Sequence, residues 1–375
     1  FWLKRLQGGA MVSAMGLRVA CLQFSPIHGR VQENLARADA LLAARRADLE
    51  DPRRPLRLLV LPEMAFSGYH FSGGQHIDPL LEDSSSPSGL AASWCRRTAA
   101  RLGCVVCCGL PTRARKRRRN SMLVVGPDGE VLDTYDKHFL YVSDRTWAEP
   151  GEGFRSLDAL PGIPLRPIGL GICMDINPRD FKAPRDAFEF AMYHKEAGSR
   201  LIVFCSAWCT NHPDDPPEAF QSPLPDAYVF NETVRYWLKR LSPLAGQDVF
   251  FVCADRVGEE DLSLLGPRGA SVAAAAGGSA GAEALEGTVR STRNRFCGCS
   301  CVLSLSDGRT LGALGATEEG VLVVDIPVDQ DEERPADRDA QAAPEPRAGA
   351  LRGSAGGRRQ AQGGGGRAFR SEADE

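Results

Sequence analysis

Gly169-Leu170-Gly171-Ile172-Cys173-Met174-Asp175-Ile176-Asn177-Pro178 is the stretch of sequence that decides the fold. Its apolar first half predicts a strand, which delivers Cys173 to a sharp turn before a helical pattern that starts near Arg179. A helix N-terminus favours a thiolate over a thiol, because partial positive charge and unpaired N–H groups stabilise the anion. Cys173 is therefore a candidate nucleophile. Cysteine is also among the most buried residue types, so a small core residue is the alternative interpretation.

Two distant segments favour the nucleophile. Glu63 follows an apolar, strand-like run at 56–61, and Lys137 follows a predicted hairpin with its turn at 127–129. In open α/β folds, ligands and catalytic groups gather where strands end. Glu63, Lys137 and Cys173 together offer a base, a cation and a nucleophile, which are the groups that acyl transfer by a thiol requires.

Composition excludes several classes of protein. The chain has 375 residues with 43% hydrophobic content, which is enough for a substantial core. Its formal net charge is -3 and its pI is near 6.2, so we expect no nucleic-acid partner. No apolar run is long enough to span a bilayer, and we expect a soluble protein without a membrane partner.

The 12 cysteines indicate a compartment. Most lie in apolar, strand-like runs with no secretory signal ahead of them, which predicts free thiols in a reducing compartment. We expect the cytoplasm and leave a mitochondrial or nuclear pool open. Cys104 and Cys107 have the spacing of half a zinc site, but no second pair follows at a suitable spacing. Cys297, Cys299 and Cys301 alternate as on one face of a strand, so core packing is preferred and no metal is predicted.

The rest of the chain alternates between strand-like and helical runs. Residues 17–24 are strand-like, and 31–46 carry apolar residues at helical spacing. Further strand-like runs lie at 104–110, 201–205, 249–253, 298–305 and 321–326. Because hairpins are mixed with βα units, we predict an α/β fold with mixed sheets.

Composition also divides the chain. Residues 1–16 are interpreted as a leader or a gene-model extension without a role in the fold. Residues 262–294 are rich in Ala, Gly and Ser, which predicts a flexible insertion. Residues 329–375 have too few large apolar side chains to offset their ordering entropy, which predicts a disordered tail. The remainder, 17–328, is predicted to be one domain.

Across 17–328 the sequence resembles the nitrilase, or carbon–nitrogen hydrolase, superfamily. The matching segments are Leu61-Pro62-Glu63-Met64, Tyr135-Asp136-Lys137-His138, 171–175, Ser206-Ala207-Trp208 and Asp255-Arg256-Val257-Gly258. The resemblance implies a four-layer α-β-β-α sandwich, present as a monomer or a homodimer. It also implies a catalytic triad of Glu63, Lys137 and Cys173 that needs no metal and no organic cofactor.

Within the superfamily, several stretches look like the fungal protein N-terminal amidases, which deamidate Asn and Gln at protein N-termini. These stretches are 66–69, 137–141, 173–178 and 236–241. In the implied reaction Glu63 accepts the Cys173 proton, and the thiolate attacks the side-chain carboxamide to give a thioester. Lys137 and the backbone N–H of Met174 hold the oxyanion. Such an enzyme would produce N-terminal Asp or Glu and ammonia in the N-degron pathway of protein turnover.

Two assignments remain open at this stage. Many relatives carry a second glutamate after the lysine, and here Asp144 has the better spacing while Glu149 has the better residue type. A carboxylate must also hold the cationic α-amine of the substrate, while a bulky side chain limits the size of the pocket. The candidates for contact with the substrate are Tyr69, Asp175, Trp208 and Asp255.

Two other functions compete with this reading. A small-molecule ω-amidase of the same superfamily would bind the substrate's own carboxylate, or would offer an apolar pocket. A catalytically silent scaffold would act through its surfaces alone. Ammonia release from peptides that begin with Asn or Gln, compared with release from free ω-amides, distinguishes the first two, and any turnover blocked by iodoacetamide excludes the third.

Overall fold

The computed structural model describes residues 16–83, 89–210, 228–268 and 293–328, all within one compact unit of the chain. The expected tail and nearly all of the expected leader lie outside these segments. None of the described helices is long and apolar enough to cross a membrane.

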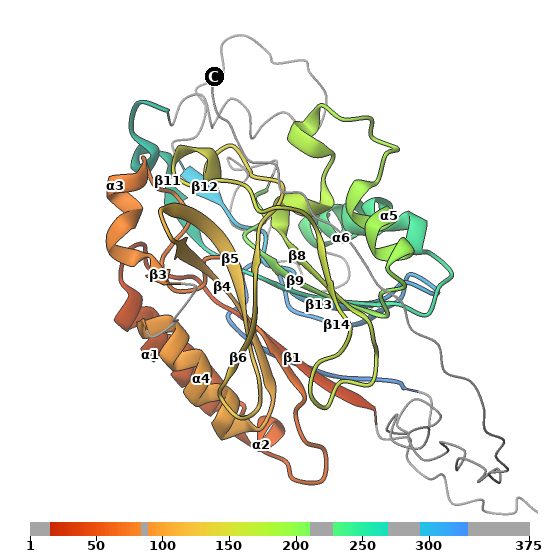
Figure 1. The fold of residues 1–375 in the computed structure, drawn as a ribbon. Coiled ribbons are helices and arrows are strands. Elements are labelled where there is room, and N and C mark those ends of the chain that lie inside the picture. The colour runs from red at the N-terminus through yellow and green to blue at the C-terminus, as the bar shows by residue number, and fades with distance from the viewer. Residues whose placement is uncertain (1–15, 84–88, 211–227, 269–292, 329–375) are drawn as a thin grey trace, which may run out of the picture. The chain divides into compact units, whose positions relative to one another are not determined.

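Two mixed sheets form the centre of the fold (Figure 1). The larger sheet has the order β15-β1-β2-β4-β5-β6, with a short strand β3 beside β4. Its strands are β1 (Leu17–Gln23), β2 (Leu58–Val60), β3 (Glu82–Asp83), β4 (Val105–Ala114), β5 (Arg117–Val125), β6 (Val131–Asp136) and β15 (Gly320–Ile326). Strands β1, β2 and β4 run parallel, whereas β5, β6 and β15 pair antiparallel with their neighbours.

The second sheet has six strands in the order β14-β13-β10-β9-β8-β7. They are β7 (Arg155–Leu157), β8 (Ile168–Ile172), β9 (Leu201–Ser206), β10 (Phe250–Asp255), β13 (Cys301–Ser304) and β14 (Thr310–Ala313). Its central strands β8, β9 and β10 are parallel. Both sheets are therefore mixed, as the combination of hairpins and βα units predicts.

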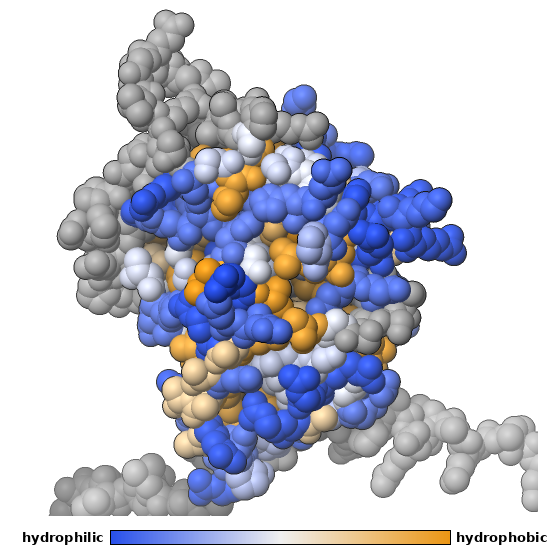
Figure 2. Space-filling view, turned by 90° about the vertical axis from the view of Figure 1, so that its left-hand side faces the viewer, coloured by the Kyte–Doolittle hydropathy of each residue, from blue (hydrophilic) through white to orange (hydrophobic). Residues whose placement is uncertain are grey.

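Helices cover the outer face of each sheet. Helices α1 (Val31–Ala44) and α4 (Leu90–Leu102) pack on the larger sheet, and α5 (Glu189–Glu196) and α6 (Tyr228–Arg240) pack on the smaller one (Figure 1). Two single-turn helices, α2 (Arg46–Leu49) and α3 (Gly74–Ile77), complete the set. The predicted four-layer α-β-β-α sandwich is confirmed. Hydrophilic residues cover most of the face seen in Figure 2, which is the side of α1 and α4.

The alternation of side chains along the strands explains why two layers of core form. In β1, Val19 and Cys21 point between the sheets, whereas Ala20 and Leu22 point toward α1 and α4. Because neighbouring residues of a strand face opposite sides, a strand that is apolar throughout has two faces to bury. The near-continuous apolar runs of the sequence thus specify strands that lie between another sheet and a helical layer.

One predicted helix begins in the wrong place. The helical pattern expected from Arg179 forms only a 3-10 turn, η4 (Arg179–Phe181), and helix α5 starts at Glu189. Asp180 and Phe181 have φ angles of 58° and 55°, which no α-helix can continue. Pro184 follows before a regular helix could form.

The predicted strand across 297–301 is also partly wrong. Only Cys301 belongs to β13, because Gly298 and Cys299 adopt φ angles of 59° and 63° and turn the backbone. Cys297, Cys299 and Cys301 are nonetheless all buried, and every cysteine of the chain is a free thiol. The prediction of free, core-packed thiols is confirmed.

The insertion predicted at 262–294 has structured ends. Residues 262–268 form a 3-10 turn, and β12 (Arg293–Arg295) pairs with β11 (Glu259–Asp261) in a separate two-stranded sheet. The part between 269 and 292 lies outside the described residues.

Candidate active site

The ends of three strands, drawn from both sheets, bring Glu63, Lys137 and Cys173 together. Glu63 follows β2, Lys137 follows β6, and Cys173 follows β8 as the first residue of the 3-10 turn η3 (Cys173–Ile176). Cys173 has a φ of 43°, so the strand-to-turn junction holds the thiol on a strained backbone.

A glycine on the neighbouring strand allows Glu63 to take its position. A Cβ atom on Gly109 of β4 would lie 2.4 Å from the Glu63 Cα and 2.6 Å from the Pro62 carbonyl oxygen. No real Cβ tolerates such contacts, so only glycine lets the Glu63 loop cross β4 this closely. The backbone N–H of Glu63 then donates to the Ser206 carbonyl oxygen at 3.2 Å, which joins the loop to the second sheet.

Lys137 is fully buried between two carboxylates. Its Nζ lies 2.7 Å from Glu63 Oε1 and 2.6 Å from Asp144 Oδ2. Asn120 of β5 joins the same two groups, since its Nδ2 donates to Glu63 Oε1 at 2.7 Å and to Asp144 Oδ1 at 3.1 Å. The other oxygen of Glu63 accepts the backbone N–H of Ala207 at 3.0 Å. Every oxygen of the two carboxylates is thus held by a donor.

These contacts decide between the two candidates for the supporting carboxylate. Asp144 is buried and directly contacts Lys137. The side chain of Glu149 is 54% exposed and lies 3.7 Å from Arg117 instead. Spacing along the chain was therefore the better guide than residue type.

Burial and the neighbouring charges favour the thiol form of Cys173 and the ammonium form of Lys137. Burial, followed by the field of Glu63, raises the pKa of Cys173 well above its usual value, although Lys137 and the Ala207 N–H oppose this. Burial lowers the pKa of Lys137, but Asp144 and Glu63 outweigh burial and hold that pKa well above the usual range. Burial, with a contribution from Asp144, also raises the pKa of Glu63.

The expectation that a helix N-terminus favours the Cys173 thiolate is therefore wrong. The turn that follows Cys173 is one short 3-10 turn, whose dipole is too small to offset the burial of the thiol. A thiol that stays protonated needs a base, and the raised pKa of Glu63 suits it to that task.

Asp175 does not fit the predicted contact with a substrate amine. Its Oδ1 accepts the N–H groups of His138 and Phe139 at 3.1 and 2.8 Å. Its Oδ2 accepts the Tyr135 hydroxyl at 2.8 Å and the Ile172 N–H at 2.9 Å. These four hydrogen bonds join the turn after Cys173 to the segment after Lys137, and they leave no carboxylate oxygen free for a substrate amine.

Asp255 has one oxygen free of such bonds. Its Oδ1 accepts the backbone N–H groups of Trp208 and Arg256 at 2.9 and 2.8 Å, while its buried Oδ2 has no hydrogen-bond partner. The hydroxyl of Ser206, its neighbour across β9 and β10, is close enough to lower the pKa of Asp255. Burial dominates and raises that pKa well above its usual value.

Tyr69 and Trp208 line the same region. The Tyr69 ring lies 5.9 Å from Lys137 Nζ, and its buried hydroxyl has no hydrogen-bond partner. Its backbone N–H donates to Glu260, which is paired with the buried Arg256. The Trp208 ring packs against the rings of Tyr236 and Trp237. A buried, unpartnered phenol beside the ammonium fits a group that awaits a ligand.

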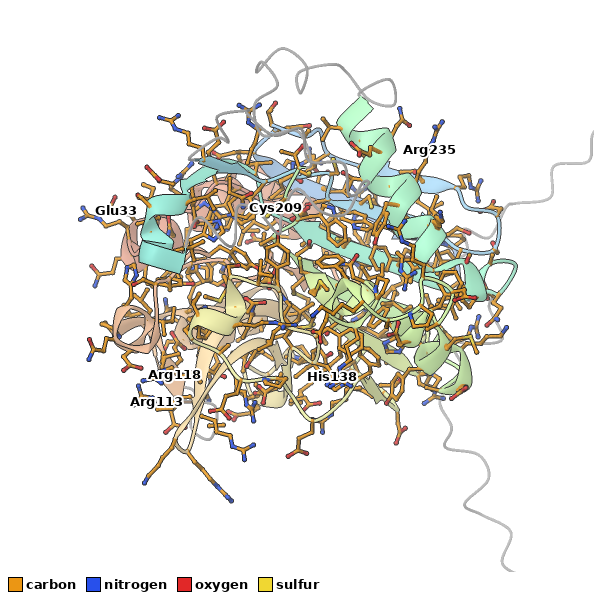
Figure 3. All side chains as sticks on the ribbon, turned by 90° about the horizontal axis from the view of Figure 1, so that it is seen from above. Glu33, Arg113, Arg118, His138, Cys209 and Arg235 are labelled. Atoms are coloured by element: carbon orange, nitrogen blue, oxygen red, sulfur yellow. The ribbon has the colours of Figure 1, made fainter. Side chains whose placement is uncertain are left out.

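One contributor escapes sequence reasoning. Asn120 bridges both carboxylates, yet it sits in a strand and belongs to no motif; its signal is an uncharged polar side chain at the start of an apolar run. A second thiol, Cys209, lies close enough to Cys173 to raise the pKa of that thiol. It is partly exposed and lies near the middle of the face seen in Figure 3. Among the described residues no group of His, Cys, Asp and Glu has the arrangement of a metal site.

The sandwich and this cluster define the class of the protein, a hydrolase with the four-layer α-β-β-α architecture of the nitrilase superfamily. The family model for carbon–nitrogen hydrolases matches residues 18–183. The protein N-terminal amidase of Schizosaccharomyces pombe is 31% identical over 330 residues, covering 83% of this chain and 99% of the relative. The chain belongs to the carbon–nitrogen hydrolase family, whose members cleave carbon–nitrogen bonds other than peptide bonds.

Solved structures share the fold. An N-terminal amidase with an Asn-Glu-Ala peptide has a TM-score of 0.64 at 17% identity, covering 83% of this chain and 97% of that one. A structure of an N-terminal amidase with a Gln-Val peptide has a TM-score of 0.64 at 18% identity, and it covers the same shares of the two chains. The expected superfamily and the expected likeness to protein N-terminal amidases are confirmed.

Proposed function

We propose that this enzyme deamidates Asn and Gln at the N-termini of proteins or peptides, releasing ammonia and leaving Asp or Glu. The observation that carries the proposal is the likeness over nearly the full length of the S. pombe protein N-terminal amidase. The described site supports the proposal, because it holds a thiol, a base and a fixed cation in one buried cluster. The free thiols of all 12 cysteines support a reducing compartment such as the cytoplasm.

Glu63 starts the reaction by taking the proton of the Cys173 thiol. The thiolate attacks the carbonyl carbon of the side-chain carboxamide, and a tetrahedral intermediate forms. Glu63 returns the proton to the departing nitrogen, so ammonia leaves and a thioester remains on Cys173. Glu63 then removes a proton from water, and the resulting hydroxide attacks the thioester. The carbon–sulfur bond breaks, Glu63 returns the proton to the Cys173 sulfur, and the acid is released.

Lys137 stabilises the oxyanion in both steps. Its ammonium stays charged because two carboxylates flank it, and it is held in place before the substrate arrives. A fixed charge in a buried site needs little reorganisation when the oxyanion forms. The backbone N–H of Met174, at the start of η3, supplies the second donor of this proposal.

Asp255 is the proposed partner of the substrate's α-amine. Its Oδ2 is a buried acceptor without a donor, which is costly unless a ligand supplies one. A protonated amine would supply that donor and would lower the pKa of Asp255, so the carboxylate and the amine would stabilise each other as ions. Tyr69 and Trp208 would then limit the size of the bound residue.

The test compares peptides that begin with free and with acetylated Asn and Gln, followed by ammonia release. Acetylation removes the charge that the buried carboxylate requires, so we expect at least about a hundredfold loss of kcat/KM. Peptides that begin with Asp serve as the blank, because they carry no carboxamide at residue 1. Equal rates on free and acetylated peptides, or faster release from free ω-amides, would instead assign the chain to small-molecule amidases.

A further inference from the structure

Phe181 is a large apolar side chain that the protein keeps exposed. It lies in η4, directly after the nucleophile segment, and is 41% exposed. Its φ of 55° follows the 58° of Asp180, so two consecutive residues adopt a left-handed backbone. This conformation is unfavourable for bulky side chains and persists at ligand sites where the surroundings enforce it. The ring is thus held outward by a strained backbone.

Tyr141 connects Phe181 with the buried cluster. The two rings pack edge to face with centroids 6.4 Å apart. The backbone N–H of Tyr141 donates at 2.9 Å to Asp144 Oδ2, the oxygen that also accepts from Lys137. Burial raises the pKa of the Tyr141 phenol well above its usual value, and Cys209 and Cys173 add to that rise. Tyr141 is partly exposed, so it reaches from the surroundings of the nucleophile to the surface.

An ion pair fixes the two aromatic segments relative to each other. Arg145 follows Tyr141 in the chain and pairs with Asp180, next to Phe181. Its guanidinium also donates to the Leu140 carbonyl oxygen at 3.4 Å. Because the Tyr141 and Phe181 rings are already in place, they lose little conformational entropy when a ligand binds.

We propose that Phe181 and Tyr141 form an apolar subsite for the side chain of the second residue of a peptide substrate. The inference rests on the proposed function, because only a substrate with a second residue extends from Cys173 toward the surface. With the carboxamide of residue 1 at Cys173, the main chain leaves past the partly exposed Tyr141, and the next side chain meets the Phe181 ring. An aromatic pair accommodates many shapes, so it favours apolar and aromatic second residues over glycine.

The experiment measures kcat/KM for ammonia release from Asn-Leu, Asn-Gly and asparagine amide. The last of these keeps the α-amine and the side-chain carboxamide but has no second residue. Phe181→Ala should lower kcat/KM for Asn-Leu by about five- to tenfold, as expected for the loss of one apolar contact. It should change the other two substrates less than about twofold. Phe181→Tyr should retain activity on Asn-Leu, because it keeps the ring.

Leu132→Ala is the matched control. Leu132 is an equally exposed apolar side chain, at 42%, and lies in β6 on the strand segment away from Lys137. This variant should leave all three substrates unchanged. If Phe181→Ala lowered kcat/KM equally for the three substrates, or did not lower it for Asn-Leu, the subsite would be overturned. The proposed function would still stand. A wild-type enzyme that releases no ammonia from any of them would overturn both.

Discussion

Lys137 has two electrostatic roles that conflict in an isolated pair. A lysine paired with Glu63 alone would lower the pKa of the base, whereas Asp144 adds a second negative charge that raises it again. Asp144 is therefore a positioning residue that helps to keep the ammonium charged and also raises the pKa of the base, whereas Asn120 bridges the two carboxylates. The cost is a buried cluster of three charged groups, which is stabilising only while all its hydrogen bonds are made.

Lys137→Arg tests whether the shape of the cation matters. The ammonium donates in two directions from one atom to Glu63 and Asp144, whereas a guanidinium spreads its donors over a plane. With no exposure around Nζ, the larger group must displace a carboxylate. We expect kcat to fall by about 100- to 1000-fold, on the scale of other losses of oxyanion stabilisation. Steady-state kinetics measures kcat, and circular dichroism checks that the variant is folded. A kcat near that of wild type would show that Lys137 acts only through its charge and not through its shape.

Asp255→Asn should separate stability from function. Burial raises the pKa of Asp255 in the folded protein, so the folded state binds its proton more tightly than the unfolded state does. The stability that this proton provides is present below the unfolded pKa of about 4 and is lost as pH rises toward the folded pKa. An amide cannot ionise, and its oxygen can still accept from Trp208 and Arg256.

The variant should therefore unfold at the same temperature as wild type near pH 4 and about 2–4 °C higher at pH 7. Its kcat/KM for peptides with a free Asn terminus should fall by about 30-fold or more, because the buried partner of the amine is lost. The preference for free over acetylated peptide should shrink in parallel. Thermal melts across this pH range provide the measurement, and a lower melting temperature at pH 7 would contradict the argument.

At the scale of elements, Asp175 joins two segments that carry catalytic groups. It accepts four hydrogen bonds, from groups on both sides of the junction between η3 and the segment after β6. Asp175→Asn would place an NH2 against two N–H donors, or against the Tyr135 hydroxyl and one N–H. The catalytic thiol and the lysine would then lose their common support.

We expect Asp175→Asn to destabilise the fold by about 1–3 kcal/mol, the cost of leaving buried donors unpaired. Its kcat should fall while KM changes little, and the preference for free over acetylated peptide should persist. This pattern is the opposite of that expected for Asp255→Asn. A large rise in KM with loss of that preference would return Asp175 to the role of substrate ligand.

Some elements of the fold could be predicted from the sequence alone, and others could not. Strands β1, β9, β10 and β15 follow from apolar runs, and the hairpin turn at 127–129 follows from its Asp-Gly pair, because both signals are local. The late start of α5 and the broken alternation at 297–301 depend on left-handed residues, which no local pattern announces when they are not glycine.

The active site, like the fold, could be predicted from the sequence only in part. Glu63, Lys137 and Cys173 stand at strand ends, so the pattern of elements places them near one another. The sequence narrows the supporting carboxylate to two residues, Asp144 by spacing and Glu149 by residue type. The bridging role of Asn120 and most hydrogen bonds of Asp175 become visible only in three dimensions, because the partners are far apart in the chain. Asn120 and Glu63 are separated by 57 residues, and Asp175 and Phe139 by 36.

At the scale of the whole molecule, two sheets each contribute part of the cluster. Glu63 and Lys137 come from the larger sheet, and Cys173 comes from the smaller one. The core between the sheets includes Cys173 itself, together with thiols such as Cys107 and Cys205. The packing that holds the sheets together thus also sets the distance between nucleophile and base, so unfolding of either sheet removes activity.

The same packing predicts how the thiols react. Burial raises the pKa values of core thiols such as Cys107, and thiolate is the reactive form. Cys173 is 7% exposed and Cys209 is partly exposed, whereas the other ten cysteines are buried outside the site. Excess iodoacetamide at neutral pH should therefore modify only Cys173 and Cys209 in the native protein, and all 12 in denaturant.

Peptide mapping by mass spectrometry, sampled alongside residual activity, measures this reaction. Loss of activity should follow the adduct on Cys173 and should accelerate with rising pH, because the pKa of this thiol is raised and more thiolate forms. Cys209→Ala should keep kcat within about twofold and remain sensitive to iodoacetamide, whereas Cys173→Ala should fold normally and have no turnover. Inactivation that followed an adduct on Cys209, with Cys173 unmodified, would move the nucleophile to the other thiol.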